Sequence, residues 1–468
     1  MIFITALSAV VILSAIFTNR FLKALGIPAL LFFLCLGLLF GADGIFKINY
    51  SNFSQAKDIA SIALGFIIFY GGFCTKWKSA KPVVAQAVVL STLGVFLTVL
   101  AVGGFCHYCL NLSLLESLLI GSVIGSTDAA SVFSILKSKK LHLKENTGSL
   151  LELESGSNDP MSYVLVVLVI TLMQGLNASF VFELFLKQMI FGIMTGILVA
   201  KIAIFVFQKT KIITDGNDSL FVIALVLGTY ALPYLYNGNP FLAVYFLGII
   251  LGNAHINNKT AMMNFFDGVT KLAQIGIFFV LGLLAIPSQL LEIVYSGGII
   301  FLFLTLIARP VVVFLLLKPF VSSVGQKIVV AWAGLRGVAS IVFAIIAMDS
   351  GIDLNYDLFH LVFLISVLSV AFQGSTLSLV ANACKMIDKD FDIRKTFNDY
   401  QEECAVKYIK ITVPDKHAWI GKQIKDIKFP NKALVLTIKR GQKNILPEDS
   451  TQIESGDKIT LTVPVENL

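Results

Sequence analysis

Charged residues are scarce in this chain. Asp, Glu, Lys and Arg together form 14% of its 468 residues, hydrophobic residues form 56%, and the mean hydropathy is +0.84. Soluble globular domains carry about 25% charged residues, so this composition excludes that class and indicates a polytopic membrane protein. The formal net charge of +7 lies mostly outside the apolar runs. It therefore reports on membrane topology, and we expect no nucleic-acid partner.

Cysteine and histidine are also scarce. The six Cys residues are too scattered for a disulfide framework, and the five His form no cluster with Cys of the kind that a transition metal needs. Residues 106–109 read Cys-His-Tyr-Cys, but one Cys pair beside one His is weak evidence for a metal site. The tail lacks a glycine-rich phosphate loop, since Gly421, Gly441 and Gly456 stand alone. We therefore expect no required cofactor.

Thirteen apolar runs are long enough, or nearly long enough, to cross a membrane. None shows the alternation of barrel strands, and backbone groups cannot stay unpaired in lipid, so we expect helices. The first run lacks a basic segment before it and a cleavage site after it, so we expect a retained helix and not a signal peptide. The runs cover approximately residues 2–18, 27–42, 58–73, 82–106, 114–136, 157–175, 181–208, 217–236, 239–254, 269–287, 295–318, 325–349 and 357–384.

Positive charge follows the odd-numbered runs. The loops after the even-numbered runs are nearly free of it, with Lys47 and Lys57 as the main exceptions. The positive-inside rule then places the N-terminus outside and the C-terminus in the cytoplasm, with the acidic loop 349–357 outside. The basic residues that follow odd-numbered runs are Arg20, Lys23, Lys76, Lys78, Lys81, Lys137, Lys139, Lys140, Lys144, Lys209, Lys211, Lys259, Lys318 and Lys327.

Two segments hold carboxylates inside or against apolar runs. Residues 125–130 include Asp128, and residues 154–160 include Glu154 and Asp159. A charged side chain at the centre of a spanning helix costs ~3 kcal/mol on insertion scales, so stability alone does not explain these acids. They could cap helix ends or occupy loops at the membrane surface. The alternative, which we favour, is an ion site near mid-membrane.

The fifth and twelfth runs have the pattern of interrupted helices. The fifth carries Gly121, Gly125 and Asp128, and the twelfth contains residues 333–340, which read Ala-Gly-Leu-Arg-Gly-Val-Ala-Ser. The two runs are seven helices apart and so cross the membrane in opposite directions. Helices one to six and eight to thirteen would then form two inverted repeats, with interrupted helices at the midplane site of a transporter. Glycine alone would indicate only close helix packing.

The composition changes after Ala383, and no later segment is long enough to span a membrane. Residues 388–403 predict a polar, helical connector. The pattern then predicts a small cytoplasmic α+β domain, whose size is marginal for a lone core, so we expect it to pair with a second copy. Its predicted elements are strands at 406–413, 433–439 and 458–464, a short helix at 419–427 and a turn at 440–441.

Three short motifs carry a family resemblance. They are residues 127–128 (Thr-Asp), residues 154–159 (Glu-Ser-Gly-Ser-Asn-Asp) and residues 334–337 (Gly-Leu-Arg-Gly). In this order, on a thirteen-helix plan, they resemble monovalent cation:proton antiporters of the sodium/proton exchanger branch. The likeness covers roughly residues 1–385.

The tail carries a second resemblance. Residues 445–447 (Ile-Leu-Pro) and 453–459 (Ile-Glu-Ser-Gly-Asp-Lys-Ile) are similar to the C-terminal domain of regulators of potassium conductance. The combination resembles potassium/proton antiporters of the cell-volume-regulation type. It implies a transmembrane antiporter domain at 1–385, a connector at 386–403 and a cytoplasmic regulatory domain at 404–468. Domains of this type often bind a small molecule, sometimes a nucleotide, at a dimer interface.

The first resemblance implies a fold and an ion site. The fold would be an all-α membrane protein of two inverted six-helix repeats, arranged as a core domain and a dimerisation domain in a homodimer. Asp159 would be the main carboxylate for the cation and the proton. Asp128 and Thr127 from the crossing helix and Ser155 would complete the cation ligands, with Asn158 beside them.

Glu154 would pair with an arginine by the same resemblance. Arg309 and Arg336 both lie in the middle of apolar runs, and both need a partner there. We favour Arg309 as the partner of Glu154 and assign Arg336 to the unwound part of the twelfth helix. Either arginine could instead reach to the membrane surface, which fits Arg309 better than Arg336.

Exchange needs only one site that holds either a proton or a cation. Burial favours the protonated form of a carboxylate, which lets a proton compete with the cation. Related antiporters that move net charge carry a second Asp where this chain has Asn158, so we expect electroneutral exchange of one cation for one proton. Potassium is favoured on the tail's resemblance alone, and sodium stays open. The expected role is cation and pH homeostasis or volume regulation, in the cell membrane.

Two other classes are less well supported. A ligand-gated cation channel needs a continuous pore and commonly a symmetric carbonyl filter, and the sequence shows no repeated filter. A membrane hydrolase built on Ser155 or Ser157 would need a base, and none of the five His lies near those serines in the sequence. We therefore predict a transporter and not an enzyme.

Overall fold

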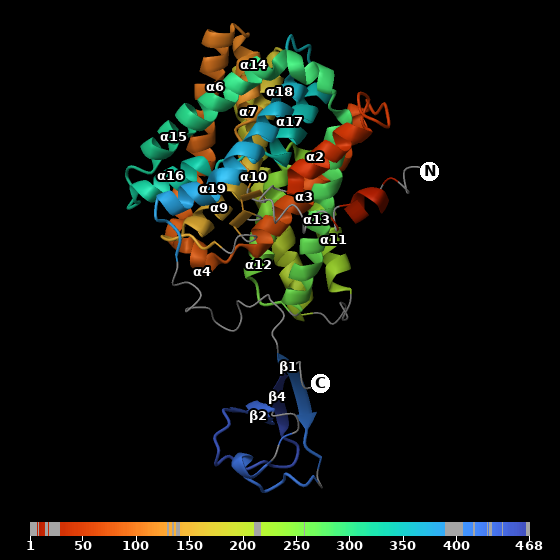
Figure 1. Cartoon of the computed structure of the whole chain (residues 1–468), viewed down its shortest axis with the longest axis vertical. Helices are drawn as coiled ribbons and strands as arrows, with labels where there is room; N and C mark the ends of the chain where they lie inside the picture. The colour runs from red at the N-terminus through yellow and green to blue at the C-terminus, as the bar shows by residue number, and fades with distance from the viewer. Residues whose placement is uncertain are drawn as a thin grey trace. The chain divides into compact units, whose positions relative to one another are not determined.

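A computed structural model describes most of the chain (Figure 1). Contacts divide it into two compact units, Met1–Asp388 and Lys389–Leu468, and each is considered by itself. Most of the first predicted run and nearly all of the predicted connector lie outside the described residues. The described residues are 29–128, 141–209, 217–256, 258–388, 406–414, 417–427, 433–441 and 443–464, with 7, 9–14, 17, 131–132, 135–136 and 429.

The first unit is built of apolar helices. Among the described residues, eight helical segments are long and apolar enough to cross a membrane, and four shorter apolar helices accompany them. Its helices are α2 (Ala29–Phe40), α3 (Phe53–Cys74), α4 (Trp77–Ala80), α5 (Val84–Val89), α6 (Val95–Leu110), α7 (Leu114–Val123), α9 (Thr147–Met173), α10 (Ala178–Lys209), α11 (Asp218–Ala231), α12 (Pro240–Asn253), α13 (Lys259–Leu284), α14 (Pro287–Phe303), α15 (Arg309–Leu316), α16 (Val324–Trp332), α17 (Val338–Asp349), α18 (Leu358–Leu368) and α19 (Ser375–Ala383).

Short 3-10 and π segments join several of these helices into longer rods. The 3-10 segments are η1 (Lys81–Val83) and η3 (Leu232–Tyr236), and the π segments are η2 (Leu90–Gly94), η4 (Leu304–Ala308) and η5 (Ser369–Gly374). The predicted class, an all-α polytopic membrane protein with a small β-containing tail, is confirmed.

The predicted start of the sixth helix is wrong. The apolar run begins at residue 157, but α9 begins at Thr147 and carries Pro160 in its interior. Hydropathy misses the first part of α9 because its polar side chains lower the average, although Thr147, Glu154 and Ser155 are buried. Asp159 therefore lies in the middle of a helix and not at its start.

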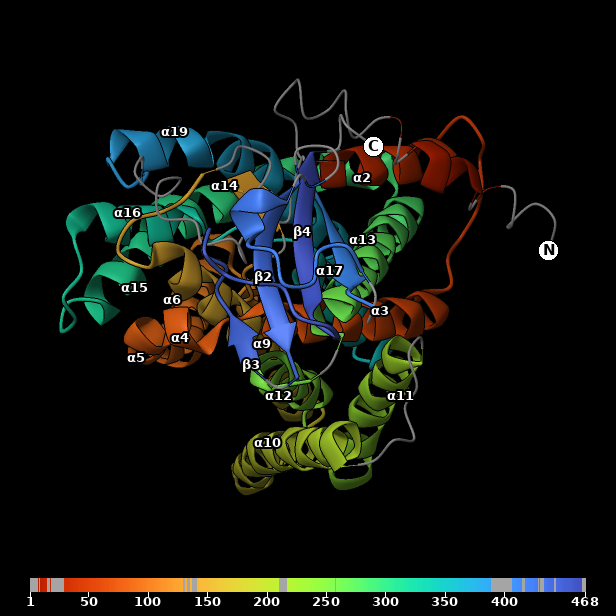
Figure 2. The same cartoon turned by 90° about the horizontal axis from the view of Figure 1, so that it is seen from below.

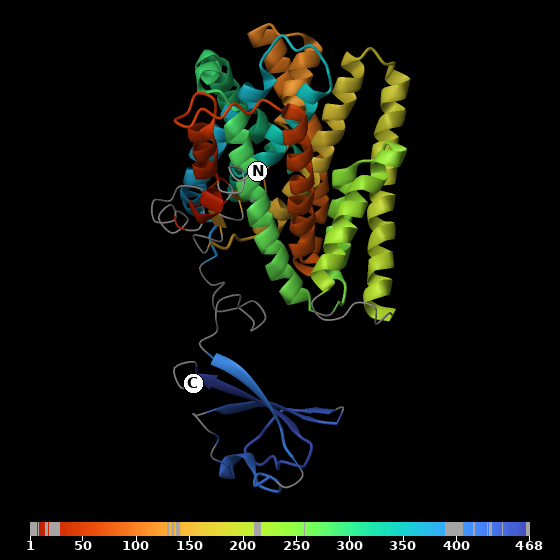
Figure 3. The same ribbon diagram turned by 90° about the vertical axis from the view of Figure 1, so that its right-hand side faces the viewer.

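The helices of the first unit form two groups (Figure 2). In one group α12 packs against α3 and α10, and α13 packs against α2 and α3. Figure 3 shows α10 and α11, coloured yellow to yellow-green, along one edge of the unit. The other group contains α5–α7, α9 and α14–α19, and α9 also contacts α12 and α10. The helix α17 of this group also packs against α3, so the two groups meet along α9 and α17.

Both helices predicted to be interrupted are interrupted. α7 ends at Val123, and residues 126–128 are not helical before the helix resumes at residue 131. α16 ends at Trp332, residues 334–337 are not helical, and α17 starts at Val338. The breaks fall at the predicted glycines and charges.

Two of the π segments, η2 and η4, lie at corresponding places in the two halves, as the two interrupted helices do. The fourth helix contains η2 and the eleventh contains η4, again seven helices apart. η4 directly precedes Arg309 and Pro310, and a proline removes a helical hydrogen bond, which accounts for the local widening. Matching irregularities in helix pairs four/eleven and five/twelve support the inverted repeat.

The second unit is a four-stranded antiparallel sheet in the order β1-β4-β2-β3. The three predicted strands are β1 (Val406–Thr412), β2 (Leu434–Arg440) and β4 (Lys458–Pro464). A further strand, β3 (Lys443–Ile445), was not predicted and pairs with β2 through the turn at Gly441, whose φ is +60°. β3 has only 3 residues, which is too few to show the alternation of apolar and polar residues that predicts a strand.

The predicted helix at 419–427 is wrong. Only Ile424–Asp426 forms a single 3-10 turn. Gly421 has a φ of +76°, and its amide donates to the Ile453 carbonyl at 2.8 Å, so this stretch pairs with residues 452–453 instead of coiling on itself. These backbone groups bond to a segment distant in the sequence, so they are not available for a local helix.

One ion pair fixes the end of the sheet. Arg440 donates to both carboxylate oxygens of Asp457 at 2.9 Å and to the Gln452 carbonyl at 2.8 Å. Burial alone would raise the pKa of Asp457, but the Arg440 guanidinium and the Glu454 amide hold that pKa below its usual range. The bidentate pair therefore holds β2 against the turn that leads into β4.

Close glycine contacts hold α3 against α12. A Cβ on Gly248 would lie 2.3 Å from the Phe69 carbonyl oxygen, so Gly248→Ala forces the two backbones apart. Overpacking of this kind costs ~1–3 kcal/mol. We expect Gly248→Ala to lower the melting temperature of the purified protein. Gly276→Ala on α13, where a Cβ meets nothing within 4 Å, is the matched control and should leave it unchanged. Equal melting temperatures for both variants would contradict this packing.

Candidate functional site

The two interrupted helices meet at their breaks. The Asp128 amide donates to the Leu335 carbonyl at 2.7 Å, so the non-helical segment of one helix supplies a hydrogen-bond partner to the other. A Cβ on Gly337 would lie 2.0 Å from an Asp128 carboxylate oxygen. Gly337 therefore has to be glycine for the breaks to approach this closely. The crossing leaves free backbone groups inside a buried part of the unit.

Arg336 hydrogen-bonds to one of the backbone carbonyls in the break. Its guanidinium donates to the Ser126 carbonyl at 2.7 Å, and its own amide donates to the Ser369 hydroxyl at 2.9 Å. Its side chain is only 1% exposed. Two further guanidinium nitrogens, Nε and Nη2, make no hydrogen bond within the described residues. Arg336 thus links both breaks and keeps donor capacity for a negative group.

α9 supplies the side chains that face the crossing. Ser126 donates to an Asp159 carboxylate oxygen, and the Asn158 amide donates to the Thr127 hydroxyl. The Asn158 carbonyl oxygen accepts from the Thr127 amide at 3.3 Å, and the Thr127 and Ser155 hydroxyls lie 3.0 Å apart. Carboxylate and hydroxyl oxygens of two helices therefore lie together, which is the ligand type that a small hard cation prefers.

Asp128 has a structural partner as well. Its carboxylate accepts from the Ser131 hydroxyl at 2.6 Å and from the Ser131 amide at 3.2 Å. A carboxylate that accepts from the backbone amide three residues later is the pattern of a helix N-cap. Asp128 therefore starts the second half of the interrupted helix while its side chain stays at the crossing.

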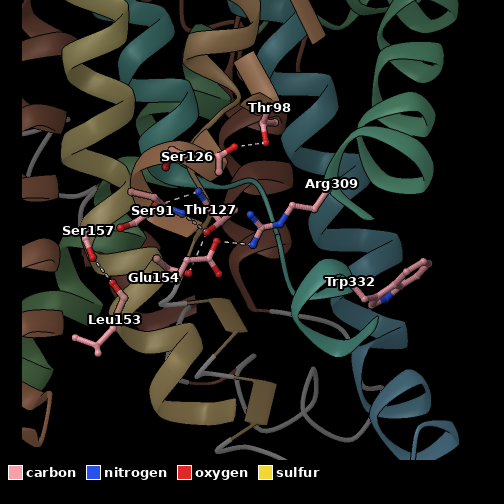
Figure 4. Close-up of polar contacts among 12 residues, drawn as sticks. Ser91, Thr98, Ser126, Thr127, Leu153, Glu154, Ser157, Arg309 and Trp332 are labelled. Carbon is pink, nitrogen blue, oxygen red and sulfur yellow. Dashed lines mark hydrogen bonds and ion pairs between the residues drawn. The ribbon is translucent and has the colours of Figure 1, made fainter. Parts of the chain in front are cut away.

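Glu154 and Arg309 form a buried ion pair (Figure 4). Arg309 Nη2 donates to Glu154 Oε1 at 2.5 Å, and the two residues are 3% and 0% exposed. Of the two arginines considered from the sequence, Arg309 makes this contact and Arg336 lies in the break of the twelfth helix. Arg309 does not extend to the surface. The pair joins α9 to the start of α15.

The buried charges of this site leave one negative charge. Asp128, Glu154 and Asp159 contribute three carboxylates, and Arg309 and Arg336 contribute two guanidinium groups. All five are at most 9% exposed. A single proton or a single monovalent cation would neutralise the remainder. No group of three or more His, Cys, Asp or Glu suited to a multivalent metal occurs within the described ranges.

All of the sequence-predicted site residues lie in this one cluster, and it contains further residues that the sequence reasoning did not assign. Ser126 contacts Asp159, Ser131 contacts Asp128, and Ser369 contacts Arg336. Ser126 could have been found, because it is a hydroxyl next to Thr127 inside an apolar run. Ser369 gives no such signal, since only the fold brings the thirteenth helix to the break of the twelfth.

The fold and the site together define a secondary transporter with a buried carboxylate site at crossed, interrupted helices. The model of the family described as "Sodium/hydrogen exchanger, transmembrane" matches residues 9–383. The chain belongs to this sodium/hydrogen exchanger family. The TrkA-C domain matches residues 408–468.

Several known proteins are similar to this chain. The K(+)/H(+) antiporter NhaP2 of Shewanella baltica is 33% identical over 458 residues, which cover 96% of this chain and 78% of that protein. The K(+)/H(+) antiporter NhaP of Alkalimonas amylolytica is 32% identical, with 96% and 79% covered. The solved structure of the sodium proton antiporter MjNhaP1 from Methanocaldococcus jannaschii has a TM-score of 0.70 and 22% identity, covering 81% of this chain and 97% of that one. This structural similarity shows that the two proteins share a fold.

The Glu154–Arg309 pair leads to a stability prediction. Removing one partner of a buried ion pair leaves the other charge uncompensated and costs ~3–5 kcal/mol. We expect Glu154→Gln to lower the thermal stability of the purified protein by an amount of this order, together with its transport rate. Glu183→Gln removes an exposed partner of Lys187 and is the control, expected to change stability by less than ~1 kcal/mol. Full stability of Glu154→Gln would refute the pair's structural role.

Proposed function

We propose that this chain exchanges one monovalent cation, with potassium favoured, for one proton across the cell membrane. The observation that carries the proposal is the charge of the site, where three carboxylates face two guanidinium groups. Membership of the sodium/hydrogen exchanger family supports cation:proton exchange. Transport of this kind requires no resident cofactor and no covalent chemistry on a bound substrate.

Competition at Asp159 explains coupling. The Ser126 hydroxyl donates to the Asp159 carboxylate, and the Thr127 hydroxyl in the break lies 3.0 Å from the Ser155 hydroxyl of α9. A cation bound here would therefore have oxygen ligands from both helices. A proton on Asp159 removes the charge that attracts the cation. The two substrates therefore occupy the site in turn, and each is released before the other binds.

Alternating access would move one helix group against the other. The crossing belongs to the group that contains α7, α9, α16 and α17, whereas α3 and α12 belong to the second group. Buried contacts within each group hold its helices together, so motion of the groups carries the site as one body. The Glu154–Arg309 pair supports this role because it ties α9 to α15 within the moving group.

Potassium is favoured over sodium by the relatives. The similar proteins of Shewanella baltica and Alkalimonas amylolytica are named potassium/proton antiporters. The Na(+)/H(+) antiporter NhaH of Halobacillus aidingensis is 28% identical over 312 residues, covering 62% of this chain and 74% of that protein, and it keeps sodium as the alternative substrate. The site oxygens alone suit either ion.

The membrane arrangement follows from charge. We propose that the chain lies in the cell membrane with its N-terminus outside and its C-terminal unit in the cytoplasm, since basic loops follow the odd-numbered helices. We also propose a homodimer, in which exposed apolar side chains of the α10–α13 group face the partner or lipid. Such an exchanger would serve cation and pH homeostasis or volume regulation.

The C-terminal unit is proposed to regulate transport without performing it. It has no span among its described residues, and it belongs to the TrkA-C type. A small molecule, such as a nucleotide, is the proposed regulator. A protein ending near Arg394 should still exchange ions, with a changed dependence on pH. Loss of all exchange in a stably inserted truncation would refute a purely regulatory role.

Asp159→Asn should abolish cation-driven proton movement in inside-out membrane vesicles from cells without their own antiporters. The amide keeps the size and the hydrogen bond to Ser126 but cannot bind a proton or balance a cation. Asp128→Asn should be nearly as severe. Asp218→Asn, at the start of α11 and away from the crossing, should be normal. Normal exchange by a well-inserted Asp159→Asn protein would reject the proposed site.

Electroneutral exchange makes a separate prediction. A potential of 100 mV acts with ~2.3 kcal/mol on each uncompensated charge that crosses. Because the proton-loaded and cation-loaded sites carry the same net charge, the final internal pH of proteoliposomes should not change with a potential set independently of potassium. A pH end point that follows the potential would show that a second group exchanges its own proton. A current without coupled proton movement would indicate a channel.

A further inference from the structure

A second carboxylate lies on the Asp159 face of α9. Glu152 is seven residues before Asp159, two helical turns and about 10 Å along the axis. It is partly exposed, whereas its neighbours Leu151 and Leu153 are buried. Its carboxylate accepts from the Thr75 hydroxyl at 3.2 Å. None of the site contacts described above involves Glu152, so its position at the junction of the two helix groups needs another explanation.

The turn around Thr75 is fixed by the second helix group. The Thr75 hydroxyl also lies 2.9 Å from the Gly71 carbonyl of α3, and the Asn253 amide of α12 donates to the Thr75 carbonyl at 2.9 Å. The Asn253 side-chain oxygen accepts from the Trp77 amide at 2.9 Å. Exposed Lys76 lies in the same turn. Glu152 therefore faces a hydrogen-bonded, polar rim at the end of α3 and α12, next to the basic residue Lys76.

Tyr245 of α12 lies between Glu152 and Asp159. A Cβ on Gly156 would be 2.6 Å from the Tyr245 ring, so the ring packs directly on the α9 backbone at Gly156. Its hydroxyl donates to the Leu153 carbonyl at 3.4 Å, so Tyr245 lies against the stretch of α9 between Glu152 and Asp159. Residues 152, 156 and 159 share one helix face. The ring thus covers the straight path from the Glu152 rim to the Asp159 carboxylate.

We infer that Glu152 and Tyr245 form the access route to Asp159 from the end of the unit that carries Thr75. Glu152 attracts the monovalent cation at the mouth of this route, and the Tyr245 ring closes the route on the glycine surface at Gly156. Movement of α9 relative to α12 slides Gly156 past the Tyr245 ring, and this movement opens the access route to Asp159. This inference rests on the proposed exchange at Asp159. It adds a step in which the cation enters from the end of the unit that carries Thr75.

The first test compares Glu152→Gln with wild type in vesicles of both orientations. At about 10 Å through a partly aqueous path, loss of one negative charge weakens cation attraction about two- to fourfold. We expect a KM for potassium raised by about this factor when potassium is added to the Thr75 side, with a smaller change from the other side. The maximal rate should stay close to wild type. Glu152→Asp should recover part of the change.

The control is Asp218→Asn, which removes another carboxylate at the same end, at the start of α11, a helix that packs mainly on α12 and α3. Its KM should equal that of wild type. An unchanged KM for Glu152→Gln in both orientations would overturn the role of Glu152. If wild type itself moves no protons with potassium or sodium, or if Asp159→Asn matches wild type, the proposed function fails instead.

The second test addresses the ring. Gly156→Ala should slow the maximal rate at least severalfold, because the new methyl group strikes the Tyr245 ring, and Gly156→Ala with Tyr245→Leu should regain much of it. Purified protein amounts and melting temperatures show which variants fold. A well-folded Gly156→Ala protein with the wild-type rate would overturn the closure. So would a double variant that folds but is no faster than Gly156→Ala alone.

Discussion

Backbone groups inside a bilayer must find partners within the protein, and the site depends on how two broken helices meet that requirement. The Asp128 amide bonds to the Leu335 carbonyl, and Arg336 bonds to the Ser126 carbonyl. Each break thus supplies part of what the other lacks. The same unwinding places Ser126, Thr127 and Asp128 opposite α9, so the proposed ion site depends on this irregular backbone.

Charge imposes the second constraint. Glu154 and Arg309 neutralise each other at 0% and 3% exposure, which removes them from exchange and leaves them a structural role. Arg336 offsets one of the two remaining carboxylates. What remains is one negative charge in a site lined by hydroxyls, and this is the smallest arrangement that can hold either a proton or a cation but not both. In the proposed exchange, this one uncompensated charge corresponds to one cation exchanged for one proton.

Much of this arrangement could be predicted from the sequence, because lipid restricts what buried polar residues can do. Glycines beside Asp128 and Arg336 predicted both interruptions, and the favoured partner of Glu154, Arg309, is the residue it contacts. The start of α9 was mispredicted, since a run average cannot distinguish polar residues paired inside a protein from polar residues in water. The contacts of Ser369 and Tyr245 depend on packing between distant helices, and no local pattern encodes them. In the tail, pairing with residues 452–453 replaced the predicted helix.

The proposed exchange requires that one carboxylate, Asp159, holds a proton or a cation in turn. Its most direct test is to add potassium, or sodium, to purified, weakly buffered protein and to measure bound cation and released protons together. Because the cation must displace the proton, the account predicts about one proton released for each cation bound, and no release from Asp159→Asn. Saturable cation binding without proton release, or equal release from Asp159→Asn, would contradict it.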